Sequence, residues 1–220
     1  KGYAGKGSFH VLGYGIDLEN DMLNQTLERL QQARRERNPL ILERLGKFGF
    51  ELTMKEVLME AGDKGQPGRP HICRVMIKKG YVHSISEAFD KYLGTGKAAY
   101  VDKYRVNCSR AAEIIIASGG IPVLAHPGLL RVNHGNSFEK LVQRLKEIGF
   151  VGIEVYYPEH SARLTDYYAH MAKRHGLLLT GGTDFHGRLK PDIKIGSGNG
   201  DLNVPYPLYK TIKQELENRL

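Results

Sequence analysis

Apolar residues recur along the chain with two different periods, and the change from one to the other predicts an α/β protein. Residues 8–17 (SFHVLGYGID) alternate between apolar and polar side chains as in a half-buried strand. Residues 20–50 then place leucines at helical spacing with charged residues on the opposite side, and Pro39 is expected to break or kink this helix. The chain therefore opens with a strand followed by a long helix.

Residues 53–97 have a different character. They contain three short helical phrases, each closed by a glycine, with Thr53 and either Ser84 or Ser86 as plausible N-caps. Strand-like alternation does not interrupt these phrases. We therefore expect a small all-helical subdomain at 53–97, separate from a sheet built by the rest of the chain.

Regular alternation of strands and helices resumes after residue 98. Short apolar strands end in polar residues and are each followed by an amphipathic helix, which is typical of a parallel sheet or barrel with its chemistry at the carboxyl ends of the strands. The expected strands are 121–128, 151–157 and 177–182, and the expected helices are 109–120, 137–149, 161–176 and 206–220.

Composition and charge narrow the class of protein. The 220 residues are 41% hydrophobic and 25% charged, which is ordinary for a globular protein. We find no apolar run long enough to span a membrane and no signal peptide, and two cysteines without a C-x-x-C motif favour a reducing, cytoplasmic setting. The net charge of +8 favours a polyanionic partner, although such a surplus often serves solubility alone.

Three potential metal ligands follow two of the expected strands. His126 lies near the end of the expected strand 121–128, while Asp184 and His186 follow the two glycines that end 177–182. In extended backbone the side chains of positions 184 and 186 point to the same side, so both can reach one ion. Imidazole nitrogen and carboxylate oxygen suit zinc, manganese or iron(II), and such a set suits hydrolysis. A single histidine of this kind is more often structural. The joint position of His126, Asp184 and His186 at strand ends nevertheless favours a metal site.

Six phrases occur in an order that resembles the polymerase and histidinol phosphatase (PHP) family of metal-dependent phosphoesterases: FHVLGYGID, GRPHI, EAFDKYLGTGKAAYV, IPVLAHPG, GIEVYYPEHS and LLLTGGTDFHG. The resemblance is strongest to the branch with nucleoside 3′,5′-bisphosphate phosphatases and 5′-to-3′ exoribonucleases. It implies a partial distorted (β/α)7 PHP barrel formed by residues 1–52 and 98–220, and a helical insertion at 53–97 that caps the active site.

The resemblance also implies a metal centre and a mechanism. His10, His126, Asp184 and His186 match the family's later metal positions, in a cleft that holds up to three divalent ions (Mn²⁺, Zn²⁺ or Fe²⁺). A metal-bound hydroxide would attack phosphorus, with His126, Asp184 and His186 as the catalytic set. The opening H-x-H motif, the S-D-G aspartate and a G-x-E glutamate of the family do not occur here, so we expect the chain to be an incomplete fragment without roughly the first third of such an enzyme.

Substrate contacts are expected from the insertion and from one loop. Arg69 and His71 in GRPHI lie at a helix start, where a guanidinium and free N–H groups would hold a phosphate of a nucleotide or short oligonucleotide, although a helix-start device with a solvated arginine is an equal alternative. His160 could approach the cleft or be an exposed cap residue. Glu154 is expected to accept a hydrogen bond from a metal-bound histidine or to form a salt bridge inside the barrel.

Three function classes follow. The first is a metal-dependent phosphatase or exonuclease that acts on nucleoside 3′,5′-bisphosphates or short RNA 5′ ends. The second is a non-catalytic PHP-like module that binds nucleic acid or a partner. The third is a histidinol-phosphate phosphatase, which the helical insertion with GRPHI argues against.

Overall fold

The computed structural model describes residues 9–62, 66–187 and 190–219. It divides the chain into two compact units, one formed by Lys1–Leu23 with Val106–Leu220 and the other by Asn24–Arg105. Ser8 and Leu220, at the ends of two expected elements, lie outside the described residues. No helix within the described ranges is long and apolar enough to cross a membrane.

The first unit contains a four-stranded sheet with the strand order β1-β2-β3-β4. Strands β2, β3 and β4 are mutually parallel, whereas β1 runs antiparallel to β2. The strands expected after residue 98 are therefore parallel, as predicted, whereas β1, whose direction the sequence pattern left open, is antiparallel. The strands are β1 (Val11–Tyr14), β2 (Ile121–Leu124), β3 (Gly152–Tyr156) and β4 (Leu178–Gly181).

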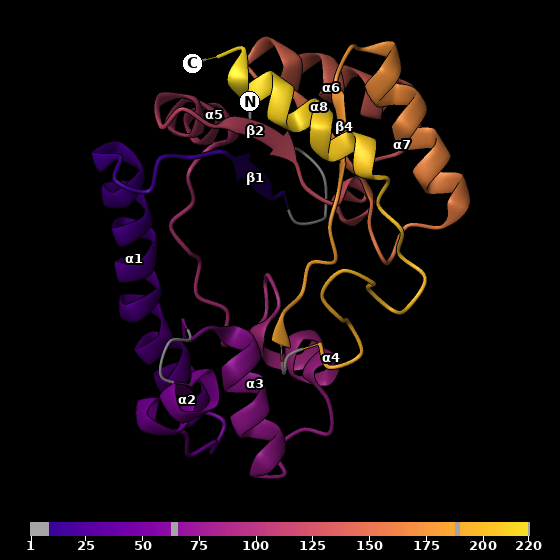
Figure 1. Cartoon of the computed structure of the whole chain (residues 1–220). Helices are drawn as coiled ribbons and strands as arrows, with labels where there is room; N and C mark the ends of the chain where they lie inside the picture. The colour runs from indigo at the N-terminus through magenta and orange to yellow at the C-terminus, as the bar shows by residue number, and fades with distance from the viewer. Residues whose placement is uncertain (1–8, 63–65, 188–189, 220) are drawn as a thin grey trace. The chain divides into compact units, whose positions relative to one another are not determined.

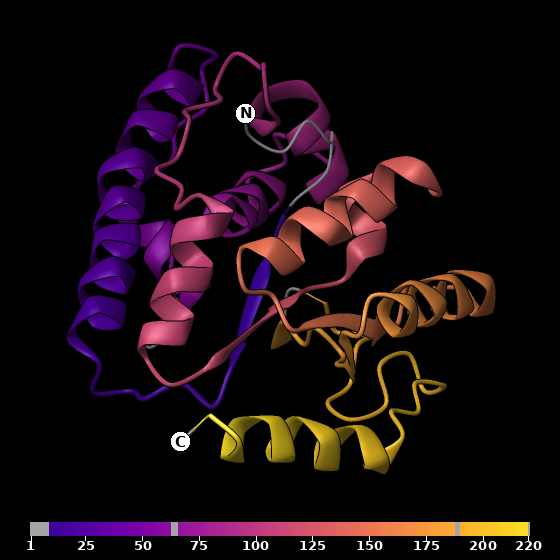
Figure 2. The ribbon, with the colours of Figure 1, turned by 90° about the horizontal axis from the view of Figure 1, so that it is seen from above.

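Helices α6 and α7 cover one face of this sheet. Both are amphipathic, and their apolar residues pack with strand residues such as Leu124, Ile153 and Val155 in one buried cluster. Figure 2 shows α6 and α7 side by side, with α8 on the other side of the strands. The helices of this unit are α5 (Cys108–Ala117), α6 (Asn136–Glu147), α7 (Ala162–Arg174), α8 (Tyr206–Glu217) and the short 3-10 helix η2 (Pro127–Leu130).

The regular elements of the second unit are all helices within its described residues, joined by turns and loops (Figure 1). Thr53 and Glu56 form a capping box at the start of α2, which confirms the predicted N-cap. Of the two serines expected as the next N-cap, Ser84 and not Ser86 caps α4 with its side chain. The elements are α1 (Asp21–Gly46), α2 (Met54–Ala61), α3 (Arg69–Lys78), α4 (Ile85–Ala88) and the π-helical turn η1 (Phe89–Leu93).

The long helix α1 belongs mostly to this helical unit. Pro39 lies inside α1, which continues as one helix from Asp21 to Gly46, so the expected break at this proline does not occur. The C-terminal half of α1 buries Ile41 and Leu45 completely among side chains of α2 and α3. The helical unit therefore begins well before residue 53, and its core needs the apolar end of α1 as well as the segment 53–97.

Candidate active site

The candidate site lies in the sheet-containing unit, at the carboxyl ends of the parallel strands. His126 follows β2, Asp184 and His186 follow β4, and Glu154 lies within β3. His10 comes just before β1, whose antiparallel direction brings its beginning to the end of β2. A backbone hydrogen bond from the Ala125 N–H to the His10 carbonyl, 3.2 Å long, extends this pairing by one residue. The four predicted ligands thus come from two strand ends, those of β2 and β4, and from one strand start, that of β1.

The structure brings His10 and His126 together. The His10 Nδ1 and His126 Nε2 atoms are 3.0 Å apart, and the two rings meet edge to face. His126 is buried, and its Nδ1 atom has no hydrogen-bond partner within the described part of the chain. Its backbone has a φ of +25°, which lies in a sparsely populated region for a side chain other than glycine. A buried ring nitrogen without a partner and a strained backbone both need an explanation, and a bound ligand would supply one.

Asp184 and His186 form a second pair. The His186 Nδ1 lies 2.6 Å from the Asp184 carbonyl oxygen and 3.5 Å from its carboxylate Oδ1. Because a carbonyl only accepts, Nδ1 carries the proton and the Nε2 atom of His186 keeps its lone pair for another partner. Asp184 has a φ of +50°, so the pair arises from a left-handed turn and not from the extended backbone that the sequence spacing suggested.

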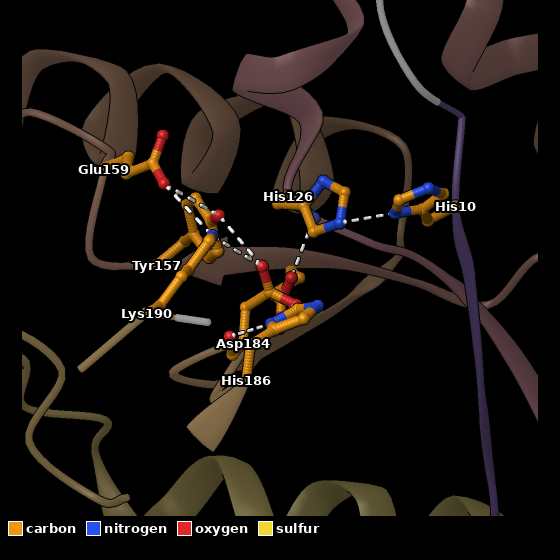
Figure 3. A network of polar contacts seen from close by, with 8 residues as sticks. His10, His126, Tyr157, Glu159, Asp184, His186 and Lys190 are labelled. Carbon is orange, nitrogen blue, oxygen red and sulfur yellow. Dashed lines mark hydrogen bonds and ion pairs between the residues drawn. The ribbon is translucent and has the colours of Figure 1, made fainter. Parts of the chain in front are cut away.

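Tyr157 connects the two pairs (Figure 3). Its ring lies 5.3 Å from that of His126, and its hydroxyl donates to the Asp184 carboxylate over 3.2 Å. Lys190 adds a cation, with its ammonium 3.1 Å from Asp184 and 3.4 Å from Glu159. Burial raises the pKa of Tyr157, and the negative charges of Asp184 and Glu159 raise it further. The Tyr157 hydroxyl therefore keeps its proton and stays a hydrogen-bond donor. Sequence patterns did not select Tyr157, Glu159 or Lys190, although Tyr157 directly follows the end of β3.

Glu154 supports His126 through the backbone. Its carboxylate accepts a hydrogen bond from the His126 N–H over 2.7 Å, so it orients that residue without touching its ring nitrogens. Burial raises the Glu154 pKa to about 7, against the lowering effect of this hydrogen bond.

A Cβ atom on Gly182 would lie 2.9 Å from the Glu154 Oε1 atom, and one on Gly181 would lie 2.6 Å from the Tyr156 Cβ atom. The two glycines before Asp184 therefore allow β4 to pass close to β3.

His160 has backbone partners for both ring nitrogens. Its Nδ1 lies 2.8 Å from the Val155 carbonyl oxygen, and its Nε2 accepts from the Gly128 N–H over 3.2 Å. Burial lowers its pKa, which keeps the ring neutral. His160 therefore joins the end of β3 to η2, and its expected contact with substrate stays a prediction.

Arg69 and His71 lie in the helical unit, at the start of α3. The Arg69 guanidinium donates to the Leu93 carbonyl over 2.8 Å and lies over the rings of Phe89 and Tyr100, so it is not a freely solvated arginine. The His71 Nδ1 accepts from the Gly68 N–H over 3.1 Å. Both residues thus help to build the beginning of α3, and their predicted contact with phosphate stays a prediction.

The donor types at the site suit a divalent metal ion, but the side chains form two pairs. Within the described ranges, no group of three or more histidine, cysteine, aspartate or glutamate side chains lies close enough to hold an ion. The orphaned Nδ1 of His126 and the open Nε2 of His186 are nonetheless the kind of nitrogen that binds such an ion. The residues therefore fit a metal by chemistry, with one pair on each side of Tyr157.

Comparison with known proteins identifies the family. The chain is 30% identical over 221 residues to a 3′,5′-nucleoside bisphosphate phosphatase of Chromobacterium violaceum, a match that covers 98% of this chain and 74% of the relative. It is also 30% identical over 187 residues to a 5′-3′ exoribonuclease of Escherichia coli, covering 85% of this chain and 63% of the relative. No family model matches the chain. The chain thus spans roughly two thirds to three quarters of the length of these relatives.

Solved structures agree with the sequence comparison. An amidohydrolase from Chromobacterium violaceum with bound sulfate and no metal is 30% identical, with a TM-score of 0.79 over 98% of this chain and 73% of that one. A proposed metal-dependent phosphoesterase from Bifidobacterium adolescentis, 24% identical, has a TM-score of 0.77 over 93% of this chain and 70% of that one, and shows the fold alone. Identity and coverage together show that the chain belongs to the PHP family of metal-dependent phosphoesterases.

Proposed function

We propose that the protein is a metal-dependent phosphoesterase that releases phosphate from nucleoside 3′,5′-bisphosphates or acts on the 5′ ends of short RNA. One observation supports this proposal: His10 with His126, and Asp184 with His186, form two pairs at the strand ends, and Tyr157 contacts a member of each pair. The relatives with these two activities support the choice of substrate class.

The same four side chains would hold the divalent ions, with Mn²⁺, Zn²⁺ or Fe²⁺ as candidates. When bound, such ions offset the negative charge that develops on phosphoryl oxygens and lower the pKa of water. Glu154 fixes the backbone of His126, and the Asp184 carbonyl fixes the ring of His186. These contacts would hold the ligands in one orientation before an ion arrives, as supporting hydrogen bonds do at metal sites.

Three finer points belong to the proposal. The four strands would be part of a distorted seven-stranded β/α barrel, which is supported by the parallel order of β2, β3 and β4. Residues 53–97 would cap the active site, with Arg69 and His71 as phosphate contacts. Two cysteines without a disulfide are compatible with a cytoplasmic setting.

The test is phosphate release from adenosine 3′,5′-bisphosphate, and release of nucleotides from a short 5′-phosphorylated RNA, with Mn²⁺ added or removed by a chelator. We expect turnover only with the metal, and at least about a hundredfold loss in His126→Asn and Asp184→Asn, since each removes a charge-stabilising ligand. His83→Asn, an exposed histidine of the helical unit, is the matched control. Equal activity in all four proteins would contradict the site assignment. Metal-independent nucleotide binding without turnover would instead support the non-catalytic module.

A further inference from the structure

Two side chains hold the strained turn that carries His126. His126 has a φ of +25°, and a residue keeps such a conformation only where surrounding contacts determine it. The Glu154 carboxylate supplies one contact, because it accepts from the His126 N–H. The second lies two residues further along, where the Gly128 N–H donates to the His160 ring over 3.2 Å. The turn 126–128 is therefore tied both to β3 and to the segment that follows β3.

The partners of the His160 ring fix the position of its proton. The Val155 carbonyl oxygen, 2.8 Å from Nδ1, can only accept, so Nδ1 carries the proton. The Gly128 N–H can only donate, so the lone pair of Nε2 faces this group. A neutral imidazole offers one donor and one acceptor, and both are used here. The ring thus joins the end of β3 to the turn with no ring nitrogen left for another partner.

Close packing holds the His160 ring in this place. The ring centroids of Tyr157 and the buried Tyr168 lie 5.1 Å and 5.0 Å from that of His160. The His160 N–H also donates to the Tyr157 carbonyl over 3.0 Å. A Cβ atom on Gly128 would lie 2.9 Å from the His160 atoms Cδ2 and Nε2. Any larger residue at position 128 would therefore push the ring and the turn apart.

The direction of the His126 imidazole depends on these contacts. Its Nδ1 atom has no hydrogen-bond partner in the described part of the chain, so no bond at that atom orients the ring. Its orientation rests on the contact with His10, on the backbone of the turn and on the neighbouring Tyr157 ring, 5.3 Å away. Because His160 contacts both the turn and Tyr157, a shift of His160 would reach His126 by two routes.

We propose that His160 is a positioning residue, which ties the turn 126–128 to the end of β3 and thereby fixes the direction of the His126 imidazole. Hydrogen bonds that orient a ligand change metal affinity by about ten- to a hundredfold. The expected effect on metal affinity rests on the proposed function, whereas the effect on the His126 ring does not.

Three substitutions separate positioning from packing. His160→Gln brings an amide oxygen near the place of Nε2, where it can accept from the Gly128 N–H. His160→Asn brings its amide near the place of Nδ1, where it can donate to the Val155 carbonyl but cannot reach Gly128. His160→Phe keeps an aromatic ring and makes neither bond. His134→Phe is the matched control, because the His134 ring bonds to the hydroxyl of the same Tyr168.

The test has one readout with metal and one without. Electron paramagnetic resonance of free Mn²⁺ gives the affinity of the full chain without substrate, and histidine-selective NMR in a chelator follows the ring of His126. We expect His160→Phe and His160→Asn to weaken Mn²⁺ binding by about tenfold or more and to shift the His126 signals. His160→Gln should keep most of the affinity, and His134→Phe should match the unmodified chain.

Gly128→Ala tests the same contact from the other side. Its methyl group would separate the turn from the His160 ring, so it should weaken Mn²⁺ binding and shift the His126 signals as His160→Phe does. This variant and His160→Gln keep the test valid if His160→Phe does not fold, which circular dichroism would show.

Three results would overturn the proposal. One is the same Mn²⁺ affinity and the same His126 signals in His160→Phe as in the unmodified chain. Another is that His160→Gln behaves no better than His160→Asn. The third is a raised KM for adenosine 3′,5′-bisphosphate in His160→Phe at unchanged Mn²⁺ affinity, which would make His160 a substrate contact. Absence of Mn²⁺ binding by the unmodified chain, with His126 signals that still shift in His160→Phe and not in His160→Gln, would count against the proposed function alone.

Discussion

Two consecutive glycines show how single residues set the geometry of the site. Gly181 and Gly182 both lie against β3, the first against the Tyr156 backbone and the second against the Glu154 carboxylate. Neither has a left-handed φ, so the requirement is for space and not for backbone freedom. Close approach of β4 to β3 then carries Asp184 and His186 to the level of His126.

We predict that Gly181→Ala destabilises the protein by about 1–3 kcal/mol, because the new methyl group would overlap the Tyr156 side chain and carbonyl. Gly46→Ala is the control, since a Cβ atom there meets nothing within 4 Å. Urea unfolding followed by circular dichroism measures both. Equal midpoints for the two variants would show that β4 can move away without cost.

Glu154 makes the stability of the metal-free protein depend on pH. Its folded pKa of about 7 lies above the ordinary value of 4.5, so the folded protein binds a proton more tightly than the unfolded chain. The free energy of unfolding should therefore fall as the pH rises from 4.5 to 7, by up to about 3 kcal/mol, and this contribution should stay constant above pH 7.

Glu154→Gln should remove that loss, because the amide oxygen can still accept from the His126 N–H and no charge is buried. The measurement is urea unfolding of both proteins in a chelator at several pH values between 4 and 8. The difference between the variant and the unmodified protein should grow with pH over this range. A difference independent of pH would mean that Glu154 ionises in the fold as it does in water.

Cys73 and Cys108 should differ in reactivity. Burial raises the pKa of the Cys73 thiol to about 12, whereas Cys108 is half-buried at the start of α5. At pH 8 we expect one equivalent of a thiol reagent to react with the native protein, at Cys108, and a second only after unfolding. Cys108→Ser should then abolish the native reaction, and rapid labelling of that variant would place Cys73 outside the core.

At the scale of elements, caps and apolar stripes explain where helices begin. The Thr53 hydroxyl accepts from the Glu56 N–H, while the Glu56 carboxylate accepts from the Thr53 N–H over 2.8 Å. Thr53→Ala should cost about 1 kcal/mol of stability, and Thr53→Ser should restore most of it because the hydroxyl returns. Thermal unfolding measures both, and equal loss in the two variants would assign the effect to the methyl group.

The direction of β1 is the feature at this scale that matters most for the site. Its antiparallel pairing with β2 places Val11 opposite Leu124, so the residue before the strand meets the residues after β2. Local alternation of apolar residues is the same in parallel and antiparallel strands. The pattern at 8–17 therefore predicted a strand correctly without predicting its direction.

For the whole molecule, the two units have separate apolar cores. One core contains Leu145 and Tyr168 under the sheet, and the other contains Ile72 and Met76 among the helices. Ile72→Ala and Leu145→Ala should each cost about 2–5 kcal/mol within their own unit. We expect hydrogen exchange to accelerate in the unit that carries the change and much less in the other. Uniform acceleration over both units by either variant would show that they unfold together.

The sequence by itself determined the order of helices and strands, the N-caps and the positions after strands where reactive side chains occur. These features depend on local periodicity and on hydrogen bonds between near neighbours, which a short stretch of chain specifies. Only the tertiary structure decided that His10 meets His126, that Tyr157 and Lys190 hold Asp184, and that Arg37 is buried. Each of these contacts joins residues brought together by strand pairing or by packing of a distant segment, and neither strand direction nor burial of a charged side chain is visible in local pattern.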